Sequence, residues 1–402
     1  MITMNRQVLA ALVVVSATVL AGCGAFGGSE SPTATPETAS TTTNANSSTP
    51  ERTATTDNRV SVYGDLAVNA SLVWERLESL FGETYEPPSV IVQQRSGEPM
   101  ARPLAAHLGL GEGADSYTDG TAGGQYLPNE DRVVFFPRNG SRNNVERILV
   151  HEFAHAIQSR IGLNERAPHG AAHGSVIEGG AVYIEDTYTR EFLGFSSIER
   201  RCERYRNGSP YARNWQQSYC FGGEYFAETL DSPSDFLDPD LRLPNTTEQV
   251  LHPESTDQPR NLTVVDKTPR DWTTPATMER QGELFIRTVL GVELSEDRAA
   301  DAAAGWGNDR LLTVTGDTEG YVWVLRWDTE TDADGFESAF ADYLDARGNK
   351  TADGWTVDND RYRLSTIDER TVAVVTGNET FVESVMVTKD DKNITVSADG
   401  SA

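Results

Sequence analysis

The sequence predicts an α+β protein in which a mainly helical unit with a small edge sheet is followed by a smaller region built on an antiparallel sheet. Apolar residues recur at helical spacing between Asn143 and Gly162, and a further helix is expected near 278–290. Beyond residue 304 the pattern changes to short strands separated by helices. We therefore expect one unit over residues 59–304 and a second, α+β region over 305–402.

The first of these helices has recognisable limits. Asn143 has the form of a capping box with Glu146 three positions later, and Gly162 ends the run. The apolar residues at helical spacing between these limits are Val145, Ile148, Leu149, Phe153 and Ile157. This helix contains the sequence His-Glu-Phe-Ala-His, which begins at residue 151.

The two histidines of this sequence stand four positions apart. His151 and His155 therefore lie one above the other on a helix and can direct both imidazoles at one ion. Glu152 can reach a metal-bound water without being a ligand itself. Glu178, in a second apolar segment, is the candidate third ligand. Three protein ligands plus water is the arrangement of a catalytic zinc site.

Other interpretations of these residues stay open. An amphipathic helix with two solvated histidines and a glutamate has the same pattern. Ser175 with Glu178 also has the form of a capping box, which would make Glu178 structural. Gly179 and Gly180 argue against that role because glycine is a poor helix residue, and they fit a place where a helix closely approaches the metal helix.

A second pair of histidines could be mistaken for ligands. His169 and His173 are also four apart, but they follow Pro168 and flank Gly170. These residues predict a loop rather than a regular helical face. We expect a structural or solvated role for the pair, with contact to a substrate cleft as the alternative.

The order histidine, histidine, distant glutamate resembles the gluzincin group of zinc metallopeptidases. Further blocks are similar to a largely uncharacterised family of HExxH-containing surface proteins, whose haloarchaeal members are cell-surface lipoproteins. The blocks that carry this resemblance are Gly124–Pro128 before Val133–Phe136, His151–Gln158, Ile177–Tyr183, Thr247–Glu254 and Gly305–Arg310.

The resemblance implies zinc on His151, His155 and Glu178. It also implies hydrolysis of peptide bonds by a zinc-activated water, with Glu152 as the general base. His252 is the candidate for a downstream histidine that donates a hydrogen bond to the oxyanion, although a turn histidine before Pro253 would look the same.

Two further gluzincin features are less directly matched. A carboxylate four residues after the glutamate ligand often supports the first histidine, but this position is Val182, so Glu185 and Asp186 are the possible substitutes. A strand near the metal helix typically binds the substrate backbone. Arg132–Phe136, followed by Pro137, is consistent with an edge strand that accepts a peptide, and an ordinary buried strand is the alternative.

The N-terminal region predicts an exported, lipid-anchored protein. Val8–Ala21 has the length of a signal h-region, and Leu20–Cys23 looks like a lipobox in which Cys23 is lipid-modified. A secretory signal that happens to contain a cysteine is the alternative. We expect a signal peptide over 1–22 and a disordered Ser/Thr-rich tether over 23–58, which would place the enzyme on the outer face of the cell membrane.

Composition and sequons agree with a cell-surface protein in strong salt. Lys and Arg number 34 against 61 Asp and Glu, which gives a net charge of −27. Dispersed negative charge favours solubility in high salt and makes nucleic-acid binding improbable, although an acidic protein that does not depend on salt has the same composition. Potential N-glycosylation sites are Asn46, Asn69, Asn139, Asn207, Asn245, Asn261, Asn349, Asn378 and Asn393.

Two cysteines remain after Cys23. A disulfide between Cys202 and Cys220 would contribute about 3 kcal/mol in the chain-entropy model, and two buried thiols are the alternative. Neither residue has metal-ligand spacing.

The C-terminal region is expected to form an antiparallel sheet with helices on one side. Its expected strands are Leu311–Thr315, Tyr321–Trp327, Arg361–Thr366 and Thr371–Thr376, and its expected helices are Asp332–Ala346, capped by Asp332, and Thr380–Met386. The alternating aromatic residues near Trp306 and Trp323 favour core packing over a carbohydrate-binding surface.

The sequence thus leads to one main hypothesis, a membrane-anchored extracellular zinc metallopeptidase. The first alternative is a gluzincin-like binding or structural surface glycoprotein that keeps the metal but does not turn over substrate. The second is a cell-envelope glycoprotein whose histidines are incidental. The retained Glu152 favours the enzyme, since a scaffold has no need of a base.

Overall fold

The computed structural model describes residues 59–94, 103–113, 122–269, 272–275, 277–315, 319–390 and 392–398. The expected signal peptide, Cys23 and the tether lie outside these residues. Among the helices in the described ranges, none has both the length and the apolar character needed to cross a bilayer.

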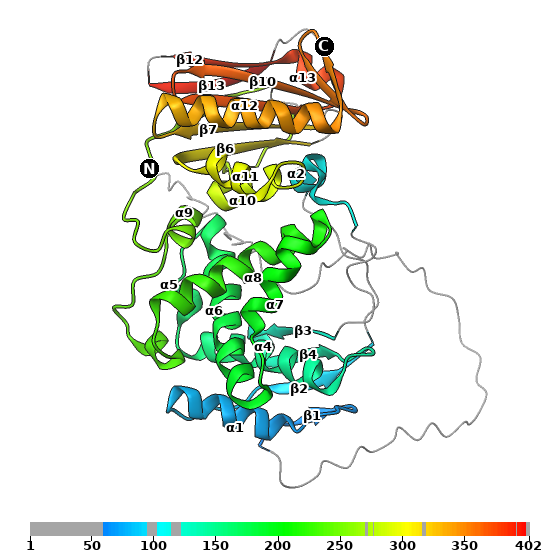
Figure 1. Ribbon diagram of the computed structural model, residues 1–402, viewed down its shortest axis with the longest axis vertical. Helices are drawn as coiled ribbons and strands as arrows, with labels where there is room; N and C mark the ends of the chain where they lie inside the picture. Colours follow the sequence, from blue (N-terminus) through cyan, green and yellow to red (C-terminus); the bar gives the residue numbers. More distant parts are fainter. Residues whose placement is uncertain are drawn as a thin grey trace, which may run out of the picture.

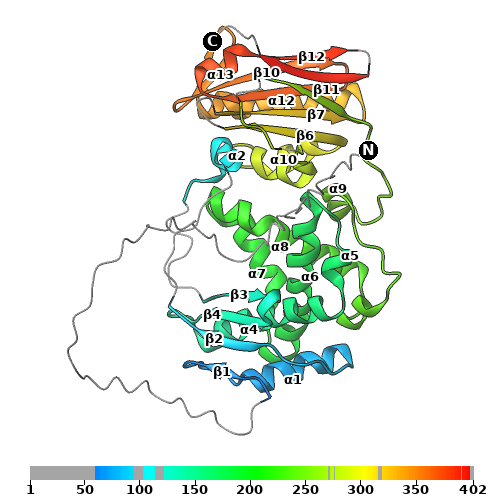
Figure 2. The same ribbon diagram turned by 180° about the vertical axis from the view of Figure 1, so that it is seen from behind.

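The fold is α+β, as expected, and its described elements form two units stacked along the long axis of the molecule (Figure 1). The first unit holds a four-stranded sheet and most of the long helices. The second holds two sheets with helices against the larger one, and the view from behind shows the same separation (Figure 2).

The sheet of the first unit has the strand order β1-β2-β4-β3. Its strands are β1 (Val62–Tyr63), β2 (Ser89–Val92), β3 (Gly123–Leu127) and β4 (Arg132–Phe136). Because β4 pairs in parallel with β2 and antiparallel with β3, the expectation that Arg132–Phe136 is an edge strand was wrong. The edge beside the helices is β3.

Two helices carry the candidate ligands, α4 (Arg142–Arg160) and α6 (Ala171–Tyr188). Ser141, rather than Asn143, caps α4, because the Ser141 side chain accepts a hydrogen bond from the backbone N–H of Asn144 at 3.4 Å. Ser175 lies inside α6, so its capping box with Glu178 does not exist. His173 also belongs to α6, contrary to the expected loop, while His169 precedes that helix.

The helix α8 (Pro210–Thr229) packs backbone to backbone against α6. A Cβ atom on Gly179 would lie 2.4 Å from the Cα atom of Gly222, so these two glycines permit the contact. The close approach expected at Gly179 is therefore to α8 and not to the metal helix. Gly180 does face α4, since a Cβ there would lie 3.0 Å from the side-chain amide nitrogen of Gln158.

Smaller helices complete the first unit. Trp74 of α1 (Ala70–Phe81) packs edge to face on Phe153 of α4, with ring centroids 5.1 Å apart. Cys202 of α7 (Ser197–Asn207) forms a disulfide with Cys220 of α8. The remaining elements are η2 (Pro128–Glu130), α5 (Leu163–Arg166), η3 (Thr189–Leu193), η4 (Pro233–Leu237) and α9 (Thr247–Leu251).

The second unit is built on a six-stranded antiparallel sheet with the order β6-β7-β11-β10-β9-β8. Its strands are β6 (Trp306–Val314), β7 (Gly320–Trp327), β8 (Asn349–Thr351), β9 (Gly354–Val357), β10 (Asp360–Asp368) and β11 (Thr371–Gly377). One face is covered by α10 (Gly282–Leu290), α11 (Glu296–Ala303) and α12 (Glu330–Arg347). Trp306 and Trp323 are buried in this core, so the expectation of core packing is confirmed.

The other face of the sheet is also covered. It packs against α13 (Glu379–Ser384) and a three-stranded sheet of β12 (Val385–Asp390), β13 (Asn393–Ala398) and β5 (Thr263–Lys267). The expectation of helices on one side only was wrong, because α13 lies on the face opposite to α10, α11 and α12. The expected helix Thr380–Met386 also ends earlier, at Ser384, and the chain continues as β12. Thr329 is the N-cap of α12, and Asp332 takes the third helical position of the capping box.

The expected boundary between residues 304 and 305 cuts through this second unit. Apolar residues of α10 and α11 share a core with β6, β7 and α12. The earlier strand β5 pairs in parallel with β13. Two still earlier elements, α2 (Pro103–Ala105) and η1 (Ala106–Leu110), also contribute to that core and lie beside α10 (Figures 1 and 2).

Candidate metal centre

Two imidazoles and one carboxylate oxygen converge between α4 and α6. The Nε2 atom of His151 lies 3.2 Å from Oε2 of Glu178, and the Nε2 atom of His155 lies 3.3 Å from the same oxygen. In a tetrahedral site with metal–ligand bonds of about 2.0 Å, ligand atoms are separated by about 3.3 Å. The His151–His155–Glu178 group can therefore hold a metal ion.

The group is shielded from solvent except at one ligand. His151 is 1% exposed and Glu178 is 3% exposed, whereas the side chain of His155 retains 13% of its accessible surface. Solvent therefore reaches the group from the side of His155. Burial also strengthens the electrostatic interaction among the three side chains.

Each histidine has a partner on the ring nitrogen that faces away from Glu178. The Nδ1 atom of His151 lies 2.9 Å from Oε2 of Glu185, in a close contact that is bent away from a linear hydrogen bond. The Nδ1 atom of His155 lies 2.9 Å from the amide oxygen of Gln158, whose nitrogen donates to the carbonyl of Ile177 at 2.8 Å. These contacts leave both Nε2 lone pairs for a metal.

Glu185 is therefore the residue that supports the first histidine. It is fully buried and also contacts Arg147 at 2.7 Å and Arg201 at 3.2 Å. The other possible substitute, Asp186, does not contact His151 in this way. It accepts hydrogen bonds from Ser196 and from the backbone of Ile198 at the start of α7.

Burial and the charges of the neighbouring side chains dominate the electrostatics of this group. Burial lowers the pKa of His155, but the carboxylate of Glu178 raises it further, and the result is a pKa of about 9. Burial raises the pKa of Glu178, and the two histidines outweigh that effect and hold the pKa well below its usual range. Glu178 is thus an anionic ligand at any physiological pH.

Glu152 lies between the ligands and the edge strand β3. It is 1% exposed, and a Cβ atom on Gly124 of β3 would lie 2.5 Å from its Cγ atom. Burial raises the pKa of Glu152, and the neighbouring charges of His151 and His155 oppose that shift. The carboxylate therefore lies beside the ligands with a raised affinity for a proton.

His252 follows α9 and points toward the second unit. Its Nε2 atom lies 3.2 Å from Oε1 of the buried Glu283 on α10, and 53% of its side-chain surface is exposed. Within the described residues, the contacts of His252 do not include the metal ligands. The expected hydrogen bond to an oxyanion therefore gains no support from them.

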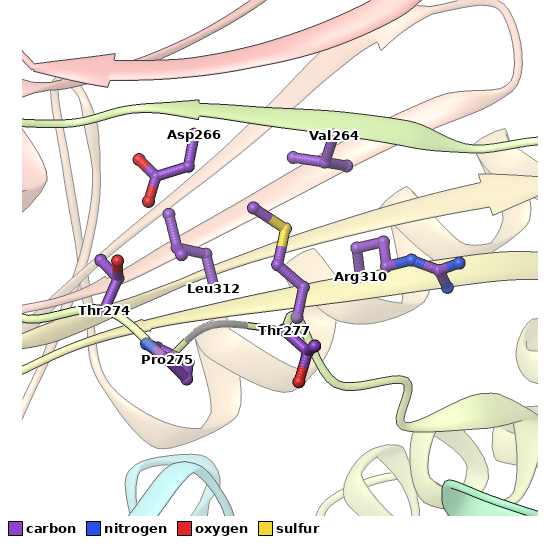
Figure 3. A pocket seen from close by; sticks show the side chains of 8 residues that line it. Val264, Asp266, Thr274, Pro275, Thr277, Arg310 and Leu312 are labelled. Carbon is purple, nitrogen blue, oxygen red and sulfur yellow. The ribbon is translucent and has the colours of Figure 1, made fainter. Parts of the chain in front are cut away.

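Two other features lie apart from this centre. Glu248, Asp257 and Asp328 bring carboxylate oxygens together, but Arg260 already neutralises Asp328 at 2.5 Å. A pocket lies against β5 and β6, and none of the metal ligands lines it (Figure 3). The residues lining this pocket include Val264, Asp266, Thr274, Pro275, Arg310 and Leu312.

Several residues around the ligands were missed by the sequence analysis. Arg147 precedes His151 by four positions, so helical spacing alone could have placed it on the same face. Gln158 stands three positions after His155 and could have been found in the same way. Tyr219, whose ring stacks on His151 with centroids 5.7 Å apart, and Arg201 come from other helices and had no signal in the sequence.

Comparison with known protein families gives a match within the second unit. Residues 273–386 match a family described as a domain of unknown function (DUF8575). This segment begins before the expected boundary and contains none of the metal ligands. No curated protein and no solved structure matches the chain.

Proposed function

We propose that this protein is a zinc-dependent peptidase that acts outside the cell, anchored to the membrane through a lipid on Cys23. The observation that carries the proposal is the convergence of two Nε2 atoms and one carboxylate oxygen with Glu152 beside them. Two imidazoles and one carboxylate form a common donor set of catalytic zinc sites.

The residues of the chain divide the chemistry between them. A bound zinc ion would supply Lewis acidity and lower the pKa of a water molecule at the open side. Glu152 would take a proton from the attacking water and pass it to the leaving amine, which is the task of a general base that then acts as an acid. Its raised pKa makes it a stronger base than a solvent-exposed carboxylate.

The edge strand β3 is suited to hold the substrate. One side of β3 is paired with β4, and within the described sheet its other side has no strand partner. An extended peptide can add to such an edge through main-chain hydrogen bonds. Gly124 brings the backbone of β3 against Glu152, so a peptide bound there would pass beside the base.

A binding protein that retains metal without turnover is the main rival, and Glu152 argues against it. Burying a carboxylate beside other charged groups carries a desolvation cost. Metal binding alone does not require this residue, because the three ligands and their supporting residues are complete without it.

Two measurements on protein purified in high salt test the proposal. Metal analysis should give one zinc per chain, and a content well below one would end it. Wild type should cleave a mixed peptide library, whereas Glu152→Gln should bind zinc and leave the library intact. The exposed Glu165→Gln on α5 is the matched control, and equal product from wild type and Glu152→Gln would exclude the peptidase.

A further inference from the structure

The imidazole of His151 is enclosed by residues from two helices that do not carry ligands. Arg201 of α7 reaches Glu185, and Tyr219 of α8 stacks on the ring of His151 with an interplanar angle of 27°. The guanidinium of Arg201 also lies 4.7 Å from the ring centroid of Tyr219. Arg201 and Tyr219 therefore contact each other. In addition, Arg201 contacts Glu185 and Tyr219 contacts the ring of His151.

The disulfide stands directly beside this pair in the sequence. Cys202 follows Arg201 on α7, and Cys220 follows Tyr219 on α8. The same two helix turns are thus joined twice, once by the covalent bond and once by the contact of a cation with an aromatic ring. We define the α7–α8 brace by its members, Arg201, Tyr219 and the Cys202–Cys220 disulfide.

All members of the brace are buried. Arg201 is 7% exposed, Tyr219 is 5% exposed, and the two cysteines are 1% and 0% exposed. A buried guanidinium is costly without a partner. Its contact with Glu185 at 3.2 Å meets that need and completes the pair of cations around this carboxylate, since Arg147 contacts its other oxygen.

Arg201 acts on the ligand through a single atom. Arg201 contacts the same Oε2 of Glu185 that lies 2.9 Å from Nδ1 of His151. Tyr219 restricts rotation of the imidazole from its face. We propose that the α7–α8 brace positions the imidazole of His151 and thereby sets the affinity of the metal centre, so that the disulfide supports metal binding as well as the fold.

This inference rests on the metal centre of the proposed function but not on its peptidase activity, and zinc affinity is the readout. Outer residues that orient a ligand typically contribute about tenfold to a hundredfold in metal affinity. In the full chain, Arg201→Met should therefore weaken zinc binding by about tenfold, measured by competition with a chelating dye. Arg201→Lys should restore part of the loss because it returns the charge.

The matched control is Arg200→Met, since the neighbouring Arg200 is exposed and lies over Phe195 instead of Glu185. With Co²⁺ in place of zinc, the visible absorption bands should shift in Arg201→Met and stay unchanged in Arg200→Met. A structural role of Arg201 that did not involve the ligand would leave those bands in place.

The disulfide is tested by the double change of Cys202→Ala and Cys220→Ala. Zinc affinity should fall in this variant. When the cysteine changes are combined with Arg201→Met, the fold-loss in zinc affinity should be smaller than the product of the two separate fold-losses, because both changes disturb the same α7–α8 brace. If the double variant does not fold, Arg201→Met decides alone. Folded variants with affinity within about twofold of wild type would overturn the proposal, whereas a wild type that binds zinc and cleaves nothing would overturn only the peptidase.

Discussion

Replacing Gly179 by alanine tests whether the position of Glu178 depends on the direct contact between the backbones of α6 and α8. In an unhindered helix this substitution would stabilise the fold by about 1 kcal/mol. Here the added Cβ atom would lie 2.4 Å from two backbone atoms of Gly222 and 2.9 Å from its carbonyl oxygen. Backbone atoms cannot rotate away, so the two helices must separate.

The size of the effect follows from that geometry. Carbon atoms in ordinary contact are at least about 3.5 Å apart, so the helices must separate by about 1 Å at this point. Overpacking of this kind costs about 1–3 kcal/mol, from which the gain of about 1 kcal/mol in helix propensity is subtracted. We expect the free energy of unfolding to fall by up to about 2 kcal/mol. Because Glu178 is the preceding residue, it should move with α6, and zinc affinity should fall at least about tenfold.

The assay compares this variant with Gly174→Ala on the same helix. A Cβ atom at Gly174 would meet only the side chain of Ser218, at 3.1 Å from Oγ, and that side chain can rotate. The control should therefore be as stable as wild type or slightly more stable. Denaturant unfolding and zinc competition should both separate the two variants. Wild-type stability and zinc affinity in Gly179→Ala would show that the helix contact does not fix Glu178.

Three further predictions concern stability and metal binding. Asp309 accepts hydrogen bonds from two buried indoles and two backbone N–H groups. Because Asp309→Ala leaves these donors without an acceptor, it should lower the free energy of unfolding by about 4 kcal/mol. A loss under about 1 kcal/mol would contradict this. Burial and a neighbouring carboxylate raise the pKa of Glu248 to about 7, so its stabilising contribution is full below about pH 4.5 and is lost as the pH rises through 7. Relative to wild type, Glu248→Gln should therefore gain about 1 kcal/mol at pH 8, after discounting for solvent exposure, and nothing at pH 4.5, with Glu254→Gln as the control and thermal unfolding as the measurement. Burial lowers the pKa of His155 and Glu178 raises it to about 9, so zinc must displace a proton, and the affinity in a zinc titration should rise from pH 7 to 9; a constant affinity would exclude this.

Local periodicity was enough to find the centre but not all of its support. His151 and His155 follow from helical spacing, and the second helix supplies Glu178. Val182, four positions later, packs against α7 and α8. Glu185 is seven positions after the ligand, nearly two full turns, so it returns to the same face of α6. This spacing favours Glu185 over Asp186, the two residues that the sequence analysis had left as alternatives.

Features that depend on distant pairing could not be predicted from local patterns. The sequences of β3 and β4 do not show which of the two lies at the edge, and it is the parallel pairing of β4 with β2 that leaves β3 there. The boundary of the second unit was placed too late for the same reason, since the membership of α10 in its core depends on contacts with strands that follow in the sequence. Of the C-terminal strands, β6, β7, β10 and β11 were predicted from their own apolar patterns, whereas β8, β9, β12 and β13 were not.

The segment 273–386 that matches a known family is not a separable body. It lacks β5 and β13, which pair with each other on one face of the large sheet. It also lacks two carbonyl acceptors: that of Leu108 accepts a hydrogen bond from the hydroxyl of Tyr343, and that of His107 accepts one from the hydroxyl of Tyr362. Excised at those limits, the fragment would expose apolar surface on both sides of its sheet. A fragment intended to fold alone would therefore need η1, β5 and β13 in addition to the matched segment.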